Sequence, residues 1–251
     1  TGRFMSSPNC FDRETEILTP HGWVRGFDLQ PNDQVAQWRD GHVEFVVPSR
    51  VVFSEADRLV MLKRQRHIDL ALTSDHRCLL RHRKTGELRI FAASDYPQDW
   101  QQLQAGLYHG PGIPFSIDEI RLAVAIQADG VTKALQRGYL HVGFSKARKV
   151  ERYEALLKRL GATYEKKEQY NLPDRAYRCW FKVRPCDLGG RIQALLGREK
   201  IFGDWVLKLN REQLDAFVEE VWHWDGCSAR RNQYSSSIKS NTEWVQIALA
   251  L

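Results

Sequence analysis

Residues 10–19, CFDRETEILT, decide how the first half of this chain is interpreted, because they place a cysteine directly before a stretch with the composition of a strand. Pro20-His21-Gly22 follows at once and marks a turn. Glycine accepts the positive φ that tight hairpin turns demand, so a hairpin is predicted here. The chain therefore begins with β-structure just after Cys10.

Short strands broken by turns continue through the first hundred residues. Asp40-Gly41 marks a second hairpin. Residues 92–114 are rich in proline and glycine and predict a linker. The first half is thus predicted to be all-β. The predicted strands cover residues 15–19, 23–24, 34–38, 43–47, 51–53, 59–63, 68–73 and 78–81.

The second half has a helical rhythm. Ser116 and Glu119 form a capping box for a helix that ends at Asp129-Gly130, and Asn210 caps a helix over 213–224 that ends in Asp225-Gly226. An α-β-β-α-β-β-α unit is predicted, followed by the start of a second copy, as an internal repeat of about 95 residues. The elements between the capped helices are a hairpin at 132–145, a helix at 146–160, strands at 163–169 and 177–183, and a short helix at 191–196. After the second capped helix we expect a strand at 233–238 and a helix from 242.

Composition indicates a folded protein of two domains, with 251 residues, 43% hydrophobic and 27% charged. No apolar run approaches the roughly 18 residues of a membrane span, and residues 1–5 lack a signal peptide's apolar core, which predicts a soluble cytoplasmic protein. The five cysteines are odd in number and form no CxxC pair, which argues against a disulfide framework or a structural zinc site. We expect four of them to be buried apolar residues: Cys78, Cys179, Cys186 and Cys227.

Positive charge is concentrated in one part of the chain. The net charge is +6, and residues 131–212 hold 19 Lys and Arg against 9 Asp and Glu. This surplus suggests that the second half meets a polyanion such as DNA or RNA. Solvated helix faces would produce the same tally.

Two segments of the first half resemble the splicing blocks of inteins, whose splicing unit is the Hint domain. Residues 10–19, with the nearby segments 22–24 and 28–29, resemble the opening block, and residues 72–77 (LTSDHR) resemble the second, whose signature is Thr-x-x-His. The resemblance implies that the thiol of Cys10 attacks the carbonyl of Asn9 in an N-to-S acyl shift. It makes His76 the general acid and Thr73 the stabiliser of the oxyanion. The plain alternative is that His76 is an ordinary strand histidine.

Two segments of the second half resemble the motifs of LAGLIDADG homing endonucleases: residues 122–130 (LAVAIQADG) and 218–226 (VEEVWHWDG). The resemblance implies that Asp129 and Asp225 hold Mg²⁺ at the cleavable phosphates of double-stranded DNA, with Lys200 near the water nucleophile. The second motif departs from the pattern. It has Glu219 and Glu220 where small residues allow close helix packing, and Trp224 before its Asp. We expect such bulky and charged side chains at a tight helix crossing to open the interface.

The splicing blocks that close an intein are not found in the sequence. The resemblance therefore implies an N-terminal intein portion, whose partners are a C-terminal intein fragment and a host extein. We expect the chain to be a monomer or to form a complex with that fragment. The expected segments are an extein tail or tag at 1–9, a Hint half-domain at 10–91, a linker at 92–114 and an α+β LAGLIDADG domain at 115–251. Two alternatives stay open. One is a stand-alone LAGLIDADG endonuclease with a vestigial splicing half, and the other is a non-catalytic DNA-binding module.

Overall fold

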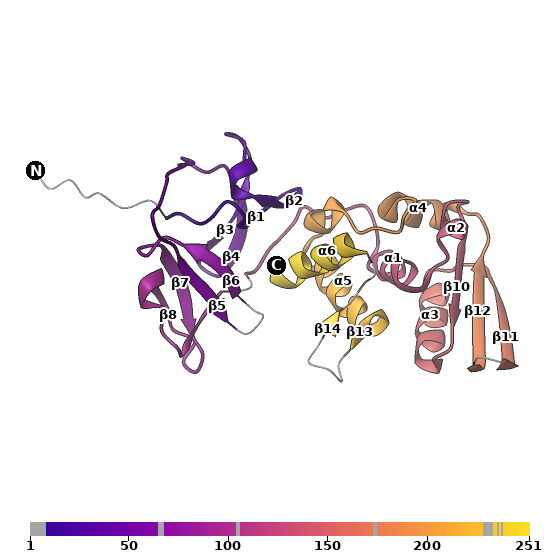
Figure 1. Ribbon diagram of the computed structural model, residues 1–251. Coiled ribbons are helices and arrows are strands. Elements are labelled where there is room, and N and C mark those ends of the chain that lie inside the picture. Colours follow the sequence, from indigo (N-terminus) through magenta and orange to yellow (C-terminus); the bar gives the residue numbers. More distant parts are fainter. Residues whose placement is uncertain are drawn as a thin grey trace, which may run out of the picture. The chain divides into compact units, whose positions relative to one another are not determined.

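The computed structural model describes residues 9–64, 68–103, 106–172, 175–227, 233–234, 236 and 238–251. The chain divides into two compact units, Thr1–Leu107 and Tyr108–Leu251, and each is described by itself. Figure 1 shows that the first unit is built of strands and that the second holds all the α-helices. The predicted linker at 92–114 includes the junction between the units, while the predicted domain boundaries stay predictions.

The described residues of the first unit form four small antiparallel sheets. Three are two-stranded hairpins, and the fourth is three-stranded in the order β8-β7-β9. Asp40 and Gly41 have φ values of 50° and 89°, which confirms the turn predicted between β3 and β4. The strands are β1 Glu16–Thr19, β2 Gly22–Arg25, β3 Val35–Arg39, β4 His42–Val46, β5 Val60–Arg64, β6 Ile68–Leu72, β7 Arg77–His82, β8 Leu88–Ala92 and β9 Trp100–Gln102.

Two short 3-10 helices, η1 Gly26–Asp28 and η2 Ala93–Asp95, complete this unit. Its core is small, and the buried cluster consists of Leu72, Cys78, Leu80 and Ala93, with partly buried rings and aliphatic side chains around it. The strand predicted at 51–53 is wrong, because these residues adopt no regular structure. Strands β8 and β9 were not predicted, since β8 is mostly exposed and β9 lies within the predicted linker.

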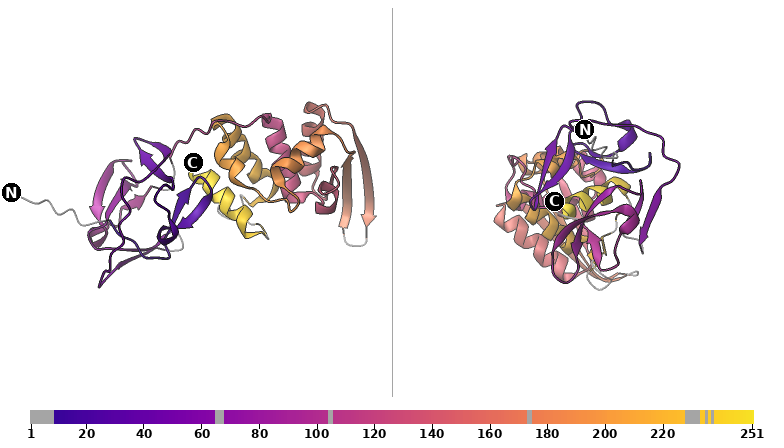
Figure 2. Two further views of the ribbon diagram at one scale, coloured as in Figure 1. Left: turned by 90° about the horizontal axis from the view of Figure 1, so that it is seen from above. Right: turned by 90° about the vertical axis from the view of Figure 1, so that its left-hand side faces the viewer.

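The second unit packs helices on a three-stranded antiparallel sheet of order β10-β12-β11. Leu140, Val142 and Phe144 of β10 and Phe181 of β12 are buried on the face that α1 and α3 cover, while Lys182 points to the opposite, solvated face. Figure 2 shows the long β11–β12 hairpin at the outer edge of this unit. The elements are α1 Ile117–Asp129, α2 Thr132–Leu135, β10 Leu140–Phe144, α3 Ala147–Arg159, β11 Tyr164–Leu172, β12 Arg175–Val183, α4 Asp187–Leu196, η3 Asp204–Lys208, α5 Arg211–Trp224, β13 Gly226–Cys227, β14 Gln233–Tyr234 and α6 Lys239–Ala250.

Helices α1 and α5 pack against each other and begin in the same way. The capping boxes predicted for them are both confirmed. Ser116 and Glu119 satisfy the first amides of α1, and Asn210 and Gln213 do the same for α5. None of the helices among the described residues is long and apolar enough to cross a membrane.

The predicted α-β-β-α-β-β-α order is wrong at its first hairpin. Residues 132–135 form helix α2, and one strand, β10, follows it. The second copy also differs from the first. Its strands β13 and β14 are each two residues long, and α6 begins at Lys239. Of the strand predicted at 233–238, residues 233–234 form β14, residues 236 and 238 lie in no strand, and residues 235 and 237 lie outside the described residues.

Candidate active site

The segment that carries Cys10 runs antiparallel to the end of strand β6. The amide of Asp12 donates to the carbonyl oxygen of Ala71 at 3.0 Å, and Phe11 forms a β-bridge with Leu72. The amide of Thr73 donates to the carbonyl oxygen of Cys10, also at 3.0 Å. These ladder-type bonds fix the main chain on the carboxyl side of Cys10 against the core strand.

A tight turn after β6 brings His76 to the same place. The His76 amide donates to the carbonyl oxygen of Thr73 at 3.0 Å, which closes the turn. The ring nitrogen Nδ1 of His76 lies 2.9 Å from the carbonyl oxygen of Cys10. The amide of Cys10 donates to Oγ1 of Thr73 at 3.4 Å. The three residues singled out in the first half of the sequence therefore lie together.

These contacts are made to the carbonyl group of Cys10 itself, on the carboxyl side of the cysteine. Its oxygen accepts from the Thr73 amide and lies within hydrogen-bond distance of the His76 ring. The role predicted for His76, protonation of the nitrogen on the amino side of Cys10, is not the contact observed and stays a prediction. The same holds for the oxyanion role predicted for Thr73.

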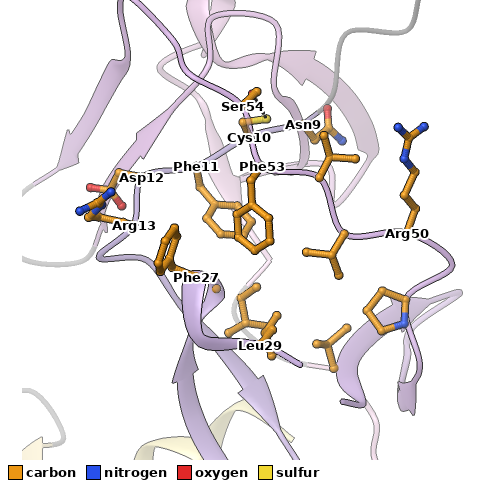
Figure 3. A pocket seen from close by; sticks show the side chains of 16 residues that line it. Asn9, Cys10, Phe11, Asp12, Arg13, Phe27, Leu29, Arg50, Phe53 and Ser54 are labelled. Atoms are coloured by element: carbon orange, nitrogen blue, oxygen red, sulfur yellow. Dashed lines mark hydrogen bonds between the residues drawn. The ribbon is translucent and has the colours of Figure 1, made fainter. Parts of the chain in front are cut away.

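The thiol of Cys10 lies at one end of a pocket of about 520 Å³ (Figure 3). Its Sγ atom is 3.5 Å from Oγ of Ser54, and either atom can be the donor. Ser54 was not predicted as a site residue, because it lies in an irregular segment and belongs to no motif of the sequence. Its only sequence signal is a hydroxyl directly after an apolar run, which is too common to be informative.

The residue before the cysteine is also anchored. Oδ1 of Asn9 accepts a hydrogen bond from the amide of Arg77 at 3.0 Å. The main chain on both sides of Cys10 is therefore tied to the segment 73–77, and the sulfur is left to face the pocket.

The remaining cysteines differ from Cys10. Cys78 and Cys179 are buried, as predicted, and burial raises the pKa of both thiols. The prediction for Cys186 is wrong, because this residue is exposed just before α4. The side chain of Cys227 lies outside the described residues. Among the described cysteines, Cys10 thus combines partial exposure with a pocket and a hydroxyl partner.

A second polar cluster lies in the other unit, where α1 and α5 end. Asp129 is the last residue of α1, and Asp225 is the C-cap of α5. Nζ of Lys149 contacts Oδ2 of Asp129 at 2.5 Å. Burial raises the pKa of Asp225, as does the charge of Asp129, while Lys149 and Lys200 oppose the shift. The structure thus brings Asp129, Asp225 and Lys200 close to one another, and the catalytic roles expected for them stay predictions.

Lys200 caps the end of helix α1. Its ammonium donates to the carbonyl oxygens of Gly130 at 2.6 Å, Gln127 at 3.1 Å and Ile126 at 3.5 Å. These are carbonyls at a helix C-terminus, where a positive charge is favourable. Burial lowers the pKa of Lys200, and the two nearby aspartates partly counter this. With three carbonyls bound, the ammonium acts as a cap of the helix.

Replacing Lys200 with methionine is expected to destabilise the second unit by about 1–3 kcal/mol, because it leaves partly buried carbonyls without their charged donor. Chemical denaturation of the two proteins measures the difference. Lys208→Met is the matched control, since its ammonium pairs with Asp204 on the surface and is expected to contribute less than about 1 kcal/mol. Equal losses in both variants would show that the carbonyl contacts do not contribute.

The raised pKa of Asp225 predicts a pH-dependent cost. The folded protein binds the carboxyl proton more tightly than the unfolded chain, so stability is lost as pH rises through the unfolded and then the folded pKa of Asp225. Asp225→Asn removes the titrating group with little change in shape. Its stability relative to the native protein should therefore be higher at neutral pH than below pH 3.8, the ordinary value. Urea denaturation over a pH series tests this. A constant difference across the series would contradict it.

The expected magnesium site finds no support in the described residues. They contain no group of three or more His, Cys, Asp or Glu side chains that could hold a metal ion. The carboxylate of Asp129 is instead neutralised by Lys149. The ammonium of Lys149 therefore lies beside Asp129, where a magnesium ion was expected.

Glu219 and Glu220 of α5 do not open the helix interface. Glu220 has a side-chain exposure of 1% and accepts two bonds from Arg152, at 2.8 and 2.6 Å, and one from Nε1 of Trp224 at 2.7 Å. Glu219 accepts from Arg121 of α1 at 2.8 Å. The expectation that these acids and Trp224 would disturb the crossing is wrong, because arginines and the indole satisfy them.

Comparison with known proteins finds no family model that matches this chain. A similarity search finds the protein named ribonucleoside-diphosphate reductase subunit beta from Aquifex aeolicus (strain VF5), which is 27% identical over 287 aligned positions. The alignment takes in 96% of this chain and 40% of the relative. The chain therefore spans less than half the length of the relative that it matches.

This finding contradicts the identification of the chain as an intein with a LAGLIDADG endonuclease. The relative is named for ribonucleotide reduction and not for splicing or DNA cleavage. The predicted fold class, a Hint half-domain followed by a LAGLIDADG domain, is corrected with it. So are the predicted enzyme activities, the Mg²⁺ cofactor, and the partners double-stranded DNA, C-terminal intein fragment and extein.

Proposed function

We propose that the first unit holds an acyl-transfer site with Cys10 as its nucleophile. The observation that carries this proposal is the environment of the sulfur, which faces a pocket and lies 3.5 Å from the Ser54 hydroxyl. The main chain of Cys10 is meanwhile held by Thr73 and His76. A cysteine needs less activation than a serine to attack a carbonyl carbon, so few auxiliary groups are required.

In the proposed reaction, Sγ of Cys10 attacks the carbonyl carbon of an acyl donor. The carbon–sulfur bond forms, the bond from that carbon to the leaving group breaks, and the product is a thioester. The thiol proton passes to the solvent, with the Ser54 hydroxyl within reach to relay it, and the leaving group ends protonated. No oxidant or reductant is needed.

Thr73 and His76 act as positioning residues in this proposal. Both contact the main chain of Cys10 and so limit the directions in which the sulfur points. Holding a nucleophile in a reactive geometry contributes a large share of many rate enhancements. A thiol stays reduced in the cytoplasm, so a cytoplasmic location belongs to the proposal.

A chromogenic ester tests the proposal. The chain is incubated with 4-nitrophenyl acetate, and the release of nitrophenolate and the mass of the chain are followed together. We expect one acetyl group per chain, on the peptide that contains Cys10, and none in Cys10→Ala. Cys186→Ala is the matched control, since it removes another exposed thiol and should react normally. Acetylation that is unchanged in Cys10→Ala would overturn the proposal.

The name of the relative suggests a second candidate function. The chain would then serve ribonucleotide reduction as part of a longer polypeptide. The described residues do not fit a redox metal centre, because they hold no group of three metal-binding side chains.

Ribonucleoside diphosphate reduction tests the second candidate. The chain is added to the reductase of Aquifex aeolicus from which the subunit named beta has been left out. The deoxyribonucleoside diphosphate formed from CDP is then measured. Product formation that depends on this chain supports the second candidate. Its absence, together with acetylation of Cys10, supports the first.

A further inference from the structure

We infer that the pocket beside Cys10 binds the apolar acyl group of a donor whose leaving group is anionic. The inference rests on the acyl transfer proposed above and adds the chemical class of the substrate. The pocket has a volume of about 520 Å³, which is within the usual range of small-molecule sites, about 300–1,000 Å³. The apolar part of the lining includes Phe11, Ile17, Phe27, Leu29, Val51 and Phe53.

The aromatic wall of the pocket is exposed to solvent. Phe27 is 55% exposed and Phe53 61%, and their ring centroids lie 5.4 Å apart in an edge-on arrangement. Figure 3 shows these rings together with Phe11 between Cys10 at one end and Leu29 at the other. Large apolar side chains gathered around a concave surface are typical of a ligand site, because an apolar ligand removes them from water.

The floor of the pocket is closely packed at Gly26. A Cβ atom added to Gly26 would lie 2.3 Å from Cε2 of Phe11 and 3.3 Å from Cδ1 of Ile17. The Phe11 ring therefore packs directly on the backbone of Gly26. Since Phe11 follows Cys10 in the chain, the ring that forms the floor and the sulfur that reacts are held by the same segment.

The charges on the lining favour an anion. Arg13 and Arg50 line the pocket, and Asp12 is the acid among the lining residues. Oδ1 of Asp12 is already occupied, accepting from the amide of Thr15 at 2.9 Å and from its hydroxyl at 2.7 Å. The Arg13 guanidinium lies over the Phe27 ring, 5.1 Å from its centroid, and no described residue pairs with Arg50.

An arginine side chain binds carboxylate and phosphate through several N–H groups at once. A guanidinium that pairs with no described residue and lies beside an apolar pocket thus suits a molecule with an aliphatic body and an anionic group. The body would lie against the phenylalanine rings while its carbonyl carbon meets the sulfur, and the anionic leaving group would face arginine.

Four esters separate the two parts of the inference. They combine an acetyl or octanoyl group with 4-nitrophenol or 3-carboxy-4-nitrophenol, and kcat/KM for acylation of Cys10 is measured for each. We expect the octanoyl esters to react at least about 10-fold faster than the acetyl esters, a preference that falls in Phe53→Ala. We expect the carboxylate to be preferred, and this preference to vanish in Arg50→Gln. Arg39→Gln is the matched control, because Arg39 does not line the pocket.

The outcomes distinguish the inference from the acyl-transfer proposal. Acylation of Cys10 at equal rates by all four esters overturns the inference and leaves the proposal standing. If no ester acylates Cys10, the proposal fails, and the pocket is tested alone by calorimetry with octanoate. Saturable binding that is lost in Arg50→Gln then supports the pocket assignment, and absence of binding overturns it.

Discussion

Replacing His76 with alanine is expected to slow acylation of Cys10 by about 100-fold, because the imidazole contacts the carbonyl oxygen that fixes the main chain of the nucleophile. A misplacement of the sulfur by about 1 Å is enough for an effect of this size. The measurement is the rate of nitrophenolate release at saturating ester. We expect the rate constant to fall more than the apparent affinity changes, since His76 acts through Cys10 and not through the pocket.

Two further variants separate positioning from a general fold defect. His76→Asn keeps a side-chain donor that can reach the carbonyl oxygen of Cys10, and it should recover much of the rate. His82→Ala removes a histidine of the same unit that bonds to Thr85, and its rate should be unchanged. A normal rate in His76→Ala would show that the contact plays no part in the reaction.

Replacing Glu220 with alanine is expected to cost about 3–5 kcal/mol of folding free energy, the usual result of removing one partner from a buried ion pair. Its carboxylate is 1% exposed and bonds to Arg152 and Trp224. Without it, the Arg152 guanidinium loses its principal counter-charge, and the pKa of Arg152, which Glu220 now raises, returns toward its ordinary value. Urea denaturation of the second unit reports the loss.

Glu219 supplies the control for this measurement. It neighbours Glu220 on α5 but its side chain is 53% exposed, so Glu219→Ala should cost less than about 1 kcal/mol. A paired replacement, Glu220→Leu with Arg152→Met, should recover most of the stability, because it removes both charges together. Equal costs for Glu219→Ala and Glu220→Ala would refute the assignment of a buried ion pair.

Elements with strong local signals could be predicted from the sequence. The capping boxes at Ser116 and Asn210 fixed the starts of α1 and α5, because the cap depends on side chains within four residues of each other. The Asp40-Gly41 turn was predictable for the same local reason. The prediction of a strand at the start of the 132–145 hairpin was wrong, because residues 132–135 (TKAL) include three good helix formers and form a single turn of helix.

The candidate site was only partly accessible to sequence reasoning. Cys10, Thr73 and His76 could be grouped through a motif, and the structure brings them together. The family named from that motif was contradicted, since the similarity found carries a different name. Ser54 and Arg50 could not be found, because they lie in an irregular segment whose approach to Cys10 depends on tertiary packing.

Glu219 and Glu220 show the limit of judging a charge by its own position. Next to a close helix crossing they suggested a weakened interface. Their partners, Arg121 on α1 and Arg152 on α3, lie far away in the sequence, and the ion pairs became visible only in three dimensions. Long-range pairing of charges was the information that the chain order did not supply.

Because its hydrophobic core is small, the first unit should unfold at a lower temperature than the second. Its buried cluster around Leu80 is held by small sheets, whereas most of the buried apolar side chains belong to the helical unit. Partial unfolding begins where least apolar surface is sequestered. On warming, the sheets that hold Cys10 should therefore unfold while the helices of the second unit remain folded. The reactivity proposed for Cys10 should then disappear at a temperature well below that at which the whole chain is unfolded.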